Sequence, residues 1–295
     1  MADAKPRIGF IGLGLMGQAF TRRLVARGYA VTGHDIDADK IKLAEGHGVT
    51  GAGSAAEVAA ASDIVQVCVI DTPAVESVVF GAGGVAEADP VGKVLVDHST
   101  TVVQATRDMA ARLEADSGMA WIDAPVSGGP PAAEEGNLAI MAGGTDIAIE
   151  VVMPVMEQLA GTFTHMGPVG AGQVTKMINQ VLVLTNYAVI AEAAKLAEAG
   201  GIDAEKIPAA LATGHAGSNL LNALYPRILA RDFEPLGRAR QILKDLDMLH
   251  DLAKQLEAPT PMADQARTLF RLLCSRGHQD LDGAAIFKLY DKDPV

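Results

Sequence analysis

Short apolar runs and longer helical segments alternate along the first half of the chain. Ala-rich stretches with helical periodicity, such as 16–28 and 54–62, separate the early apolar runs. Regular alternation of strand and helix predicts a mainly parallel sheet covered on both faces, and the strands are too apolar to have a solvent-exposed face. The predicted strands lie at 7–11, 30–35, 63–70, 93–99, 120–126, 137–143 and 162–167.

The pattern changes after about Gly170, where period-two alternation stops and helical segments follow one another. Helices are predicted at 172–200, 204–212, 218–230, 236–257, 260–276 and 283–290. We therefore predict two domains, an α/β domain over 1–168 and an all-α domain over 169–295, joined by the first long helix. Because ligands often bind between domains, the expected site is the cleft between them.

Composition and charge narrow the possible functions. The chain has 295 residues, of which 49% are hydrophobic and 20% are charged, as in an ordinary globular protein. It carries 24 Lys and Arg against 36 Asp and Glu, a formal net charge of −12. An acidic chain lacks the electrostatic footprint for nucleic acid or an anionic membrane, so we expect no partner of either kind.

The cysteines and the apolar segments predict a cytoplasmic protein. Cys68 and Cys274 are too few for a disulfide framework and fit a reducing cytosol. The N-terminus lacks the long apolar core of a signal peptide. The longest uncharged helical run, Met177 to Ala191, falls short of the ~20 apolar residues that a membrane span needs, so it is interpreted as a buried core helix.

A glycine pattern lies between the first predicted strand and the first predicted helix. Gly12, Gly14 and Gly17 form Gly-x-Gly-x-x-Gly, with Leu15 and Met16 inside the pattern. The first glycine permits a tight turn, the second lets the backbone approach a pyrophosphate, and the third lets helix and strand pack closely. The helix start attracts the negative charge. The pattern predicts a Rossmann-type, doubly wound dinucleotide-binding domain, with these five residues as cofactor contacts.

An acidic residue ends the second predicted strand at the position that selects the cofactor. Asp35 lies 18 residues beyond Gly17, where a carboxylate can accept hydrogen bonds from ribose hydroxyls and would repel a 2′-phosphate. This favours NAD over NADP, although Lys40 and Lys42 lie close in the sequence. The glycine pattern alone leaves FAD open as a further cofactor.

A single lysine opens the long apolar helix predicted at 172–200. After Lys176 no charged residue appears until Glu192. An unpartnered buried lysine is costly and its pKa falls on burial, which suits a proton-transfer group. Asn179 and Gln180 follow at i+3 and i+4, on the same helix face, and could hold a substrate hydroxyl. The alternative is a lysine near a helix start whose ammonium reaches water.

Two loops that follow predicted strands carry hydroxyl groups and exposed backbone. The stretch at 123–130 contains Ser127 followed by Gly128 and Gly129, whose N–H groups could cradle a carboxylate. Its alternative interpretation is an ordinary Pro/Gly turn. The stretch at 96–101 likewise ends in hydroxyl side chains, at the sheet edge where open α/β sheets bind ligands.

These segments together resemble the β-hydroxyacid dehydrogenase family, which includes 3-hydroxyisobutyrate dehydrogenase and tartronate semialdehyde reductase. The resemblance covers nearly the whole chain, and several motifs in the family's order are more specific than any one. They are GFIGLGLMG at 9–17, DHST at 97–100, DAPVSGG at 123–129, GNLAIMAGG at 136–144, GAGQVTKMINQ at 170–180 and LKDLDM at 243–248.

The resemblance implies a role for each matching residue. Lys176 resembles the family's catalytic lysine, the general acid/base. The family's substrate-carboxylate site corresponds to Ser127, Gly128 and Gly129, and its substrate-positioning amide to Asn179 or Gln180. Thr100 and Lys244 match positions near the nicotinamide end of the cofactor. Asp35, followed by Ile36 and not by arginine, is similar to the NAD-using branch.

Two stretches depart from the family pattern. Ile70 and Asp71 replace the usual Leu-Pro after the third predicted strand, which changes the expected cofactor contact there. Arg238 and Arg240 replace part of an apolar stretch before Lys244. Either arginine could face the site and favour a substrate with a second anionic group; in the alternative, both are solvated on a helix face.

The sequence thus predicts an NAD-dependent oxidoreductase that transfers hydride between a small β-hydroxy acid and the nicotinamide, without a metal. Two alternatives are an imine reductase on the same scaffold, against which Lys176 argues because those relatives usually lack it, and a non-catalytic dinucleotide-binding sensor. The helical half is rich in Ala and Leu and has no sheet of its own to pack on. Apolar helical surfaces of this kind predict a homodimer or homotetramer.

Overall fold

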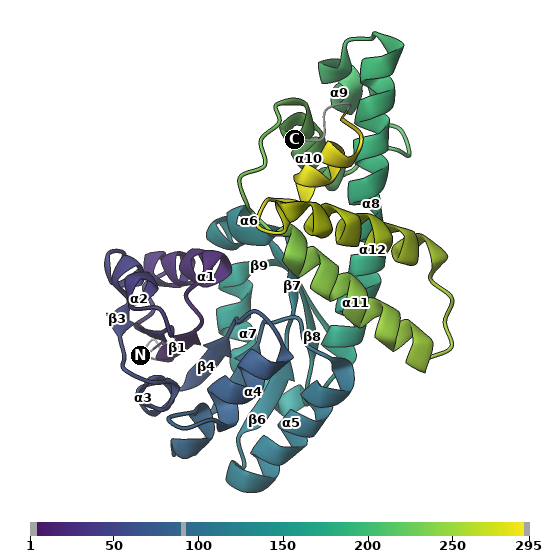
Figure 1. Ribbon diagram of the computed structural model, residues 1–295. Coiled ribbons are helices and arrows are strands. Elements are labelled where there is room, and N and C mark those ends of the chain that lie inside the picture. The colour runs from purple at the N-terminus through teal and green to yellow at the C-terminus, as the bar shows by residue number, and fades with distance from the viewer. Residues whose placement is uncertain (1–4, 90–92, 292–295) are drawn as a thin grey trace. The chain divides into compact units, whose positions relative to one another are not determined.

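The chain divides into two compact units, Met1–Lys176 and Met177–Val295. The computed structural model describes residues 5–89 and 93–291 (Figure 1). The predicted domain boundary at 168 lies before the long helix α8 (Ala171–Gly200), whereas the compact units divide within that helix, directly after Lys176. The sequence-predicted fold class, an α/β domain followed by an all-α one, is confirmed.

Unit 1 is built on a mainly parallel sheet with the strand order β3-β2-β1-β4-β5-β6-β8-β7, and β9 pairs with β8. Every pair from β3 to β6 is parallel, whereas β8 runs antiparallel to β6 and β7. The strands are β1 (Ile8–Ile11), β2 (Val31–His34), β3 (Thr50–Gly51), β4 (Ile64–Val67), β5 (Val94–Asp97), β6 (Ala120–Asp123), β7 (Val126–Ser127), β8 (Leu138–Gly143) and β9 (Ala160–Gly167). The strand order reverses between β1 and β4, where doubly wound sheets bind ligands.

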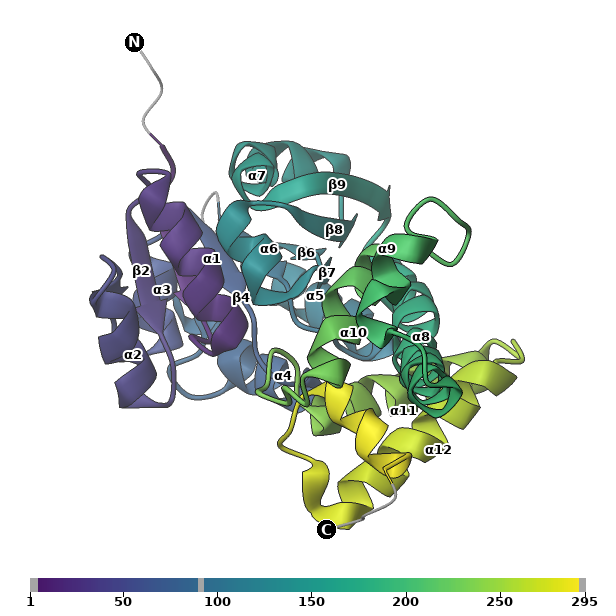
Figure 2. The ribbon, with the colours of Figure 1, turned by 90° about the horizontal axis from the view of Figure 1, so that it is seen from above.

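Helices cover both faces of this sheet (Figures 1 and 2). Successive strand residues point to opposite faces, so that Phe10 joins one core with α1, α6 and α7, while Ile11 joins another with α3, α4 and α5. The helices are α1 (Leu15–Ala26), α2 (Ala38–Glu45), α3 (Ala55–Ala60), α4 (Thr72–Phe80), α5 (Val103–Ser117), α6 (Gly129–Glu135) and α7 (Asp146–Leu159), with a 3₁₀ turn at Val85–Glu87.

Three details of the sheet differ from the sequence prediction. The strand predicted at 120–126 is broken after Asp123, because Pro125 has no N–H with which to continue a ladder. The edge strand β9 exposes about every second residue, so the expectation that the strands have no solvent-exposed face was wrong for it. The two-residue strand β3 was not predicted, since a pair as short as Thr50–Gly51 carries no periodicity.

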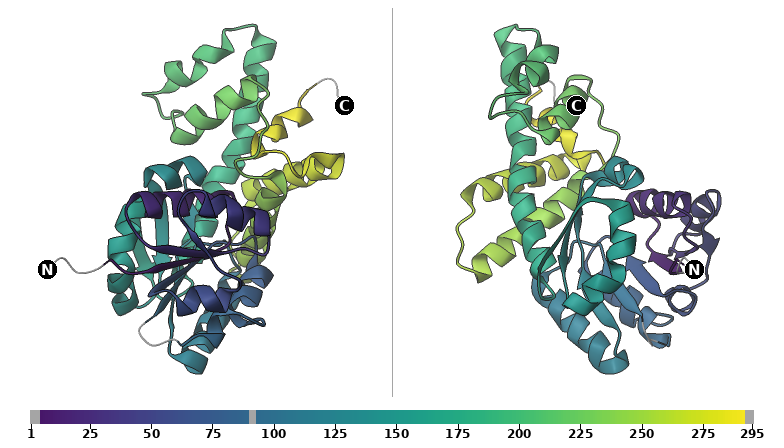
Figure 3. Two further views of the ribbon diagram at one scale, coloured as in Figure 1. Left: turned by 90° about the vertical axis from the view of Figure 1, so that its left-hand side faces the viewer. Right: turned by 180° about the vertical axis from the view of Figure 1, so that it is seen from behind.

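Unit 2 is helical (Figure 3). Its core contains residues of α8, α10, α11 and α12 together with the last 3₁₀ segment. The largest fully buried side chains of this core are Tyr225, Phe270 and Phe287. Besides α8, its elements are a 3₁₀ turn at Ala204–Lys206, α9 (Ile207–Leu211), α10 (Asn219–Leu229), α11 (Ala239–Gln255), α12 (Pro261–Leu273), a π-helical turn at Cys274–His278 and a 3₁₀ helix at Gly283–Leu289.

The long helix α8 is a core element with a largely apolar sequence. Within residues 5–89 and 93–291 it alone is long and apolar enough to cross a membrane by length and composition, so the run that was predicted to be too short passes that test as a whole helix. Core helices of globular proteins pass the same test. Buried Met177, Leu184 and Ala191 place this helix in the core of unit 2, as predicted.

Candidate active site

The glycine turn between β1 and α1 has the geometry that its sequence predicts. Gly12 adopts φ +93°, and a Cβ on it would lie 2.2 Å from the carbonyl oxygen of Cys68. A Cβ on Gly17 would lie 2.0 Å from the Gly12 carbonyl oxygen, so helix and strand pack here without room for a side chain. A Cβ on Gly14 meets nothing within 4 Å. Two glycines are therefore required by packing, while Gly14 leaves open space beside the turn.

The start of α1 offers unsatisfied donors to that space. Gly14 is the N-cap, no side chain caps the helix, and its first turn contains no acidic residue. The N–H groups of a helix's first turn have no intrahelical acceptor, and the helix dipole favours an anion beside them. Leu15 is 52% exposed and Met16 is half-buried in this first turn. The turn therefore fits the pyrophosphate of a dinucleotide.

Asp35 ties the glycine turn to the end of β2. Its Oδ2 accepts a hydrogen bond from the Leu13 N–H at 2.7 Å, and its Oδ1 accepts one from the Asp37 N–H at 2.9 Å. The Lys40 ammonium lies 3.5 Å from Asp35 and 3.7 Å from Asp37, so two carboxylates offset its charge. Each carboxylate oxygen has a second lone pair, which leaves acceptor capacity for ribose hydroxyls. The role of Asp35 in the turn was not predicted from the sequence.

The loops after β4 and β5 carry the other residues predicted to contact the cofactor. Ile70 is 49% exposed. The Asp71 carboxylate caps α4, because its Oδ1 accepts a hydrogen bond from the Ala74 N–H at 2.9 Å. Thr100 is half-buried, and it follows Ser99, whose Oγ accepts from the Val69 N–H at 2.9 Å. Both loops leave the carboxyl edge of the parallel strands, where the glycine turn also lies.

Lys176 is buried with a defined hydrogen-bond partner. Its side chain lies in the second turn of α8, the residue is 8% exposed, and Nζ donates to the Val126 carbonyl oxygen at 2.8 Å. This burial contradicts the alternative in which the ammonium reaches water. Val126 directly precedes Ser127, Gly128 and Gly129, so the amine is anchored beside the loop that the sequence predicts to bind a carboxylate.

The predicted carboxylate loop has a backbone that only glycine adopts readily. Gly128 has φ +127° and Gly129 has φ +70°, both in the region that side chains disfavour. A Cβ on Gly128 would also lie 2.6 Å from the Cβ of Ala132. Ser127 pairs with Ala139 of β8, which fixes the start of the loop. The conformation of the loop therefore depends on both glycines.

A buried carboxylate anchors the beginning of α8. Asp123 is completely buried, and it accepts hydrogen bonds from the N–H groups of Gly170 at 2.7 Å and Gln173 at 2.8 Å. Burial raises the pKa of Asp123 to about 6, even though these backbone donors favour its charged form. The carboxylate takes the place of a local N-cap residue and attaches α8 to the end of β6.

A second polar cluster lies in unit 2. The Gln180 amide accepts from Asn179 Nδ2 at 2.9 Å and donates through Nε2 to the Asp245 carboxylate. The Lys244 ammonium lies 3.2 Å from the same carboxylate. Gln180 therefore uses both ends of its amide inside the cluster, whereas Asn179 retains its amide oxygen. Asp245 was not singled out in the sequence, although its place beside Lys244 in the LKDLDM motif was the available signal.

Other candidate groups have structural explanations. Arg238 and Arg240 both pair with Asp280, at 3.1 and 3.3 Å, and are 39% and 50% exposed, which agrees with two solvated arginines. Buried His98 has its ring nitrogens 2.8 Å from the Ala124 carbonyl oxygen and 3.0 Å from the Gln66 amide. Burial lowers the pKa of His98 to about 4, so this imidazole is neutral at pH 7.

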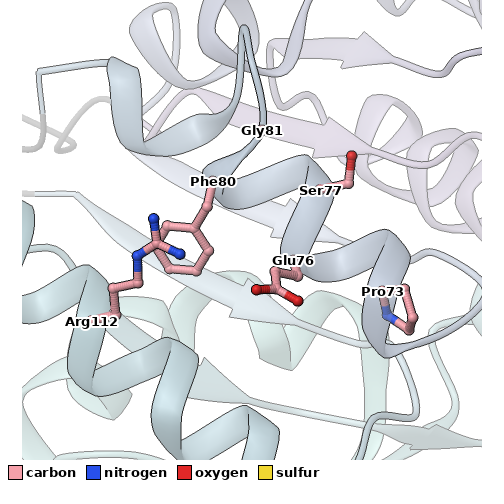
Figure 4. Close-up of a pocket in the computed structure, with 6 residues that line it drawn as sticks. All are labelled: Pro73, Glu76, Ser77, Phe80, Gly81 and Arg112. Atoms are coloured by element: carbon pink, nitrogen blue, oxygen red, sulfur yellow. The ribbon is translucent and has the colours of Figure 1, made fainter.

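A shallow surface hollow of about 330 Å³ lies between α4 and α5 (Figure 4). Phe80 stacks there under the Arg112 guanidinium, whose carbon is 4.0 Å from the ring centroid. Its lining is Pro73, Glu76, Ser77, Phe80, Gly81 and Arg112. None of these is a predicted site residue, and the hollow plays no part in the chemistry below. No cluster of three potential metal ligands occurs among the residues that the structure describes.

Comparison with known proteins assigns both halves of the chain. Residues 7–167 match the model of the NAD-binding domain of 6-phosphogluconate dehydrogenase. Residues 170–290 match the NAD-binding model of NADP-dependent 3-hydroxyisobutyrate dehydrogenase. The 2-hydroxy-3-oxopropionate reductase of Escherichia coli is 35% identical over 282 residues, which cover 95% of this chain and 95% of that enzyme.

Solved structures agree with these matches. The 3-hydroxyisobutyrate dehydrogenase of Salmonella typhimurium superposes with a TM-score of 0.88 at 28% identity, covering 97% of this chain and 100% of that one. The Mycobacterium tuberculosis 3-hydroxyisobutyrate dehydrogenase, solved with L-serine, gives 0.84 at 30% identity, with 97% and 99% covered. With these matches along its whole length, the chain belongs to the β-hydroxyacid dehydrogenase family, and it is an oxidoreductase with a nicotinamide dinucleotide as cofactor.

Proposed function

We propose that the protein transfers hydride between a small β-hydroxy acid, similar to 3-hydroxyisobutyrate, and NAD, with Lys176 as the general acid/base. The observation that carries this proposal is the anchoring of the buried Lys176 amine on the Val126 carbonyl, directly beside the Ser127–Gly129 loop. The candidate proton-transfer group and the glycine loop are thereby adjacent. This is the arrangement that a hydroxyl and a carboxylate on neighbouring carbons require.

Each residue of the site has a separate role in the proposed reaction. When bound, the nicotinamide accepts the hydride from the carbon that bears the substrate hydroxyl. Lys176 takes the hydroxyl proton at Nζ during oxidation and returns it during reduction, and Val126 holds that amine in place. The N–H groups of Gly128 and Gly129 bind the substrate carboxylate, and the Ser127 hydroxyl assists them. Asn179, three positions after Lys176 on α8, holds the remaining polar group through its amide.

The cofactor preference that we propose is NAD over NADP. Asp35 and Asp37 place two carboxylates at the end of β2, and Lys40 lies beside both of them. A 2′-phosphate bound here would meet this negative charge, and Lys40 is already paired with both carboxylates. Exposed Ile36, which follows Asp35, has no positive charge that could pair with a 2′-phosphate.

We expect Asp35→Ala to reduce discrimination against NADP. The substitution removes the repulsion of a 2′-phosphate and also the acceptor for the Leu13 N–H, so kcat/KM with NAD should fall about tenfold while that with NADP rises. Initial rates with each cofactor measure this ratio, and Asp39→Ala, in the first turn of α2, is the matched control. A wild type that already prefers NADP would show that Asp35 has no such role.

We also propose that the protein is a homo-oligomer in which α8 packs against a second copy. The side chains of Ile178, Leu182, Val189 and Leu196 are 57%, 63%, 49% and 75% exposed. Their spacings of four, seven and seven residues place them in one line along the helix, as in the apolar seam of a helix pair. Large apolar side chains that a helix leaves exposed along one line are a common mark of a subunit interface.

We expect the double substitution Leu182→Glu, Val189→Glu to convert the oligomer into a monomer, because it places two charges in the seam. Size-exclusion chromatography with light scattering measures the mass of each form. Gln255→Glu, which adds a charge to the exposed end of α11, is the control that should remain oligomeric. An unchanged mass for the double variant, or a monomeric wild type, would contradict an α8 interface.

The proposed activity is tested by the absorbance of reduced nicotinamide. Purified protein is offered NAD or NADP with 3-hydroxyisobutyrate, glycerate, serine, 3-hydroxypropionate, 4-hydroxybutyrate or threonate. Reduction of NAD by one or more of these acids is the expected result. Tight binding of NADH without turnover of any of them would instead support the non-catalytic sensor.

A further inference from the structure

The buried side chain of Gln173, in the first turn of α8, binds the loop that follows β5. Its Oε1 accepts a hydrogen bond from the Thr101 N–H at 3.1 Å, and its Nε2 donates to the Ser99 carbonyl oxygen at 2.8 Å. Gln173 is completely buried. One amide therefore holds the peptide groups on both sides of Thr100, in the way that a neighbouring strand would hold them.

The main chain of Gln173 is held just as firmly. Its N–H donates to the Asp123 carboxylate at 2.8 Å, and the same carboxylate accepts from the Gly170 N–H. Three positions further along α8, the Lys176 amine is bound to Val126. Gln173 thus connects three segments of unit 1: the Thr100 loop, the end of β6, and the helix turn that carries Lys176.

The Thr100 loop also forms hydrogen bonds to β5 and α5, and these differ from the Gln173 contacts because they do not involve α8. The Ser99 N–H donates to Asp97 Oδ1 at 2.9 Å, and the Thr101 hydroxyl lies 2.7 Å from that of Thr106 in α5. These bonds shape the loop internally and hold it to the elements beside it. The two hydrogen bonds of the Gln173 side chain, by contrast, attach the loop to α8.

We propose that Gln173 is a positioning residue, which keeps the Thr100 loop in register with the Lys176 amine. This rests on the proposed function, in which Thr100 lies at the nicotinamide end of the cofactor and Lys176 moves the hydroxyl proton. Hydride and proton leave the same carbon–oxygen unit of the substrate, so the groups that handle them must keep a fixed separation. A misplacement of about 1 Å costs on the order of 10²-fold in rate.

The direct test is Gln173→Met, which keeps the length of the side chain and removes both hydrogen bonds. We expect kcat to fall about 10- to 100-fold, while the NADH dissociation constant and the KM of the hydroxy acid change less than threefold. Because hydride transfer becomes slower relative to product release, the primary deuterium isotope effect on kcat should rise. A role confined to folding would lower the melting temperature and leave this isotope effect unchanged.

Two further variants keep the test decisive. Thr106→Val removes a buried hydrogen bond from the same loop without touching α8, so it should cost stability but leave kcat and the isotope effect as in the wild type. Gln173→Glu retains an acceptor for Thr101 and loses the donor to Ser99, so its kcat should lie between those of the wild type and Gln173→Met. If Gln173→Met does not fold, this variant alone decides.

The outcomes separate this inference from the function on which it rests. Wild-type turnover with a loss of kcat in the Gln173 variants supports both. Wild-type turnover with unchanged kcat and isotope effect in Gln173→Met, or in Gln173→Glu where that alone folds, overturns the positioning role and leaves the function standing. Equal losses of kcat in Thr106→Val and Gln173→Met also overturn it, because the link to α8 would then not matter. A wild type that oxidises no hydroxy acid removes the function and this role with it.

Discussion

Lys176→Met is expected to lower kcat by about 10²- to 10⁴-fold, the range that a positioned acid/base group contributes. Methionine has nearly the length of lysine and tolerates a buried site, so the first turns of α8 should keep their place. The variant loses the amine that takes the hydroxyl proton, while the glycine turn and Asp35 are untouched. We therefore expect the NADH dissociation constant to change little.

Steady-state rates with the best hydroxy acid and a fluorescence titration with NADH measure the two effects separately. Lys195→Met is the matched control, because Lys195 lies on the same helix in ion pairs with Glu198 and Asp291. It should keep wild-type kcat. Near-normal turnover by Lys176→Met would show that another group moves the proton, and loss of NADH binding would indicate a damaged fold.

The second large effect concerns Gly17 and Gly14. Both belong to the glycine motif, but the structure has room for a side chain only at Gly14. A methyl group on Gly17 would lie 2.0 Å from the Gly12 carbonyl oxygen, so Gly17→Ala must push α1 away from β1. We expect a destabilisation at the upper end of the roughly 1–3 kcal/mol that overpacking costs, together with loss of cofactor binding. Gly14→Ala meets no atom within 4 Å, and its φ of −69° suits alanine.

The free energy of unfolding of Gly14→Ala should therefore differ from that of the wild type by no more than about 0.5 kcal/mol, the usual range for surface substitutions. Its NADH dissociation constant should rise about tenfold or more, because the methyl group occupies space that the pyrophosphate needs. Thermal melting and NADH titration measure the stability and the NADH dissociation constant of each variant. Unchanged NADH affinity in Gly14→Ala would mean that the dinucleotide does not lie on this turn.

The sequence predicted the fold well because its signals were local. Alternating strand and helix periods placed seven strands of unit 1, and the glycine motif located the turn at β1. The signals failed where the structure depends on contacts distant in sequence. The antiparallel pairing of β8 with β6 and β7 and the exposure of β9 follow from the sheet's edge, which no period of two or 3.6 residues encodes.

The same distinction applies to the site. Lys176 stood out because a lone charge interrupts a long apolar run, and the glycines stood out by their spacing. Asp123 and Gln173 gave no such signal, since an aspartate after a strand and a glutamine in a helix are common. Their importance comes from hydrogen bonds across 47 to 74 residues of chain. For Asp71 the structure adds a local role that the resemblance did not suggest, the capping of α4.

The most direct test of the proposed activity follows the hydride itself. The hydroxy acid that reacts best is prepared with deuterium on the carbon that bears the hydroxyl, and the reduced cofactor is examined by mass spectrometry after turnover. We expect one deuterium in the reduced nicotinamide of NAD and a slower rate with the labelled acid. Reduced cofactor without deuterium, or tight NADH binding with no turnover of any hydroxy acid, would contradict hydride transfer at this site.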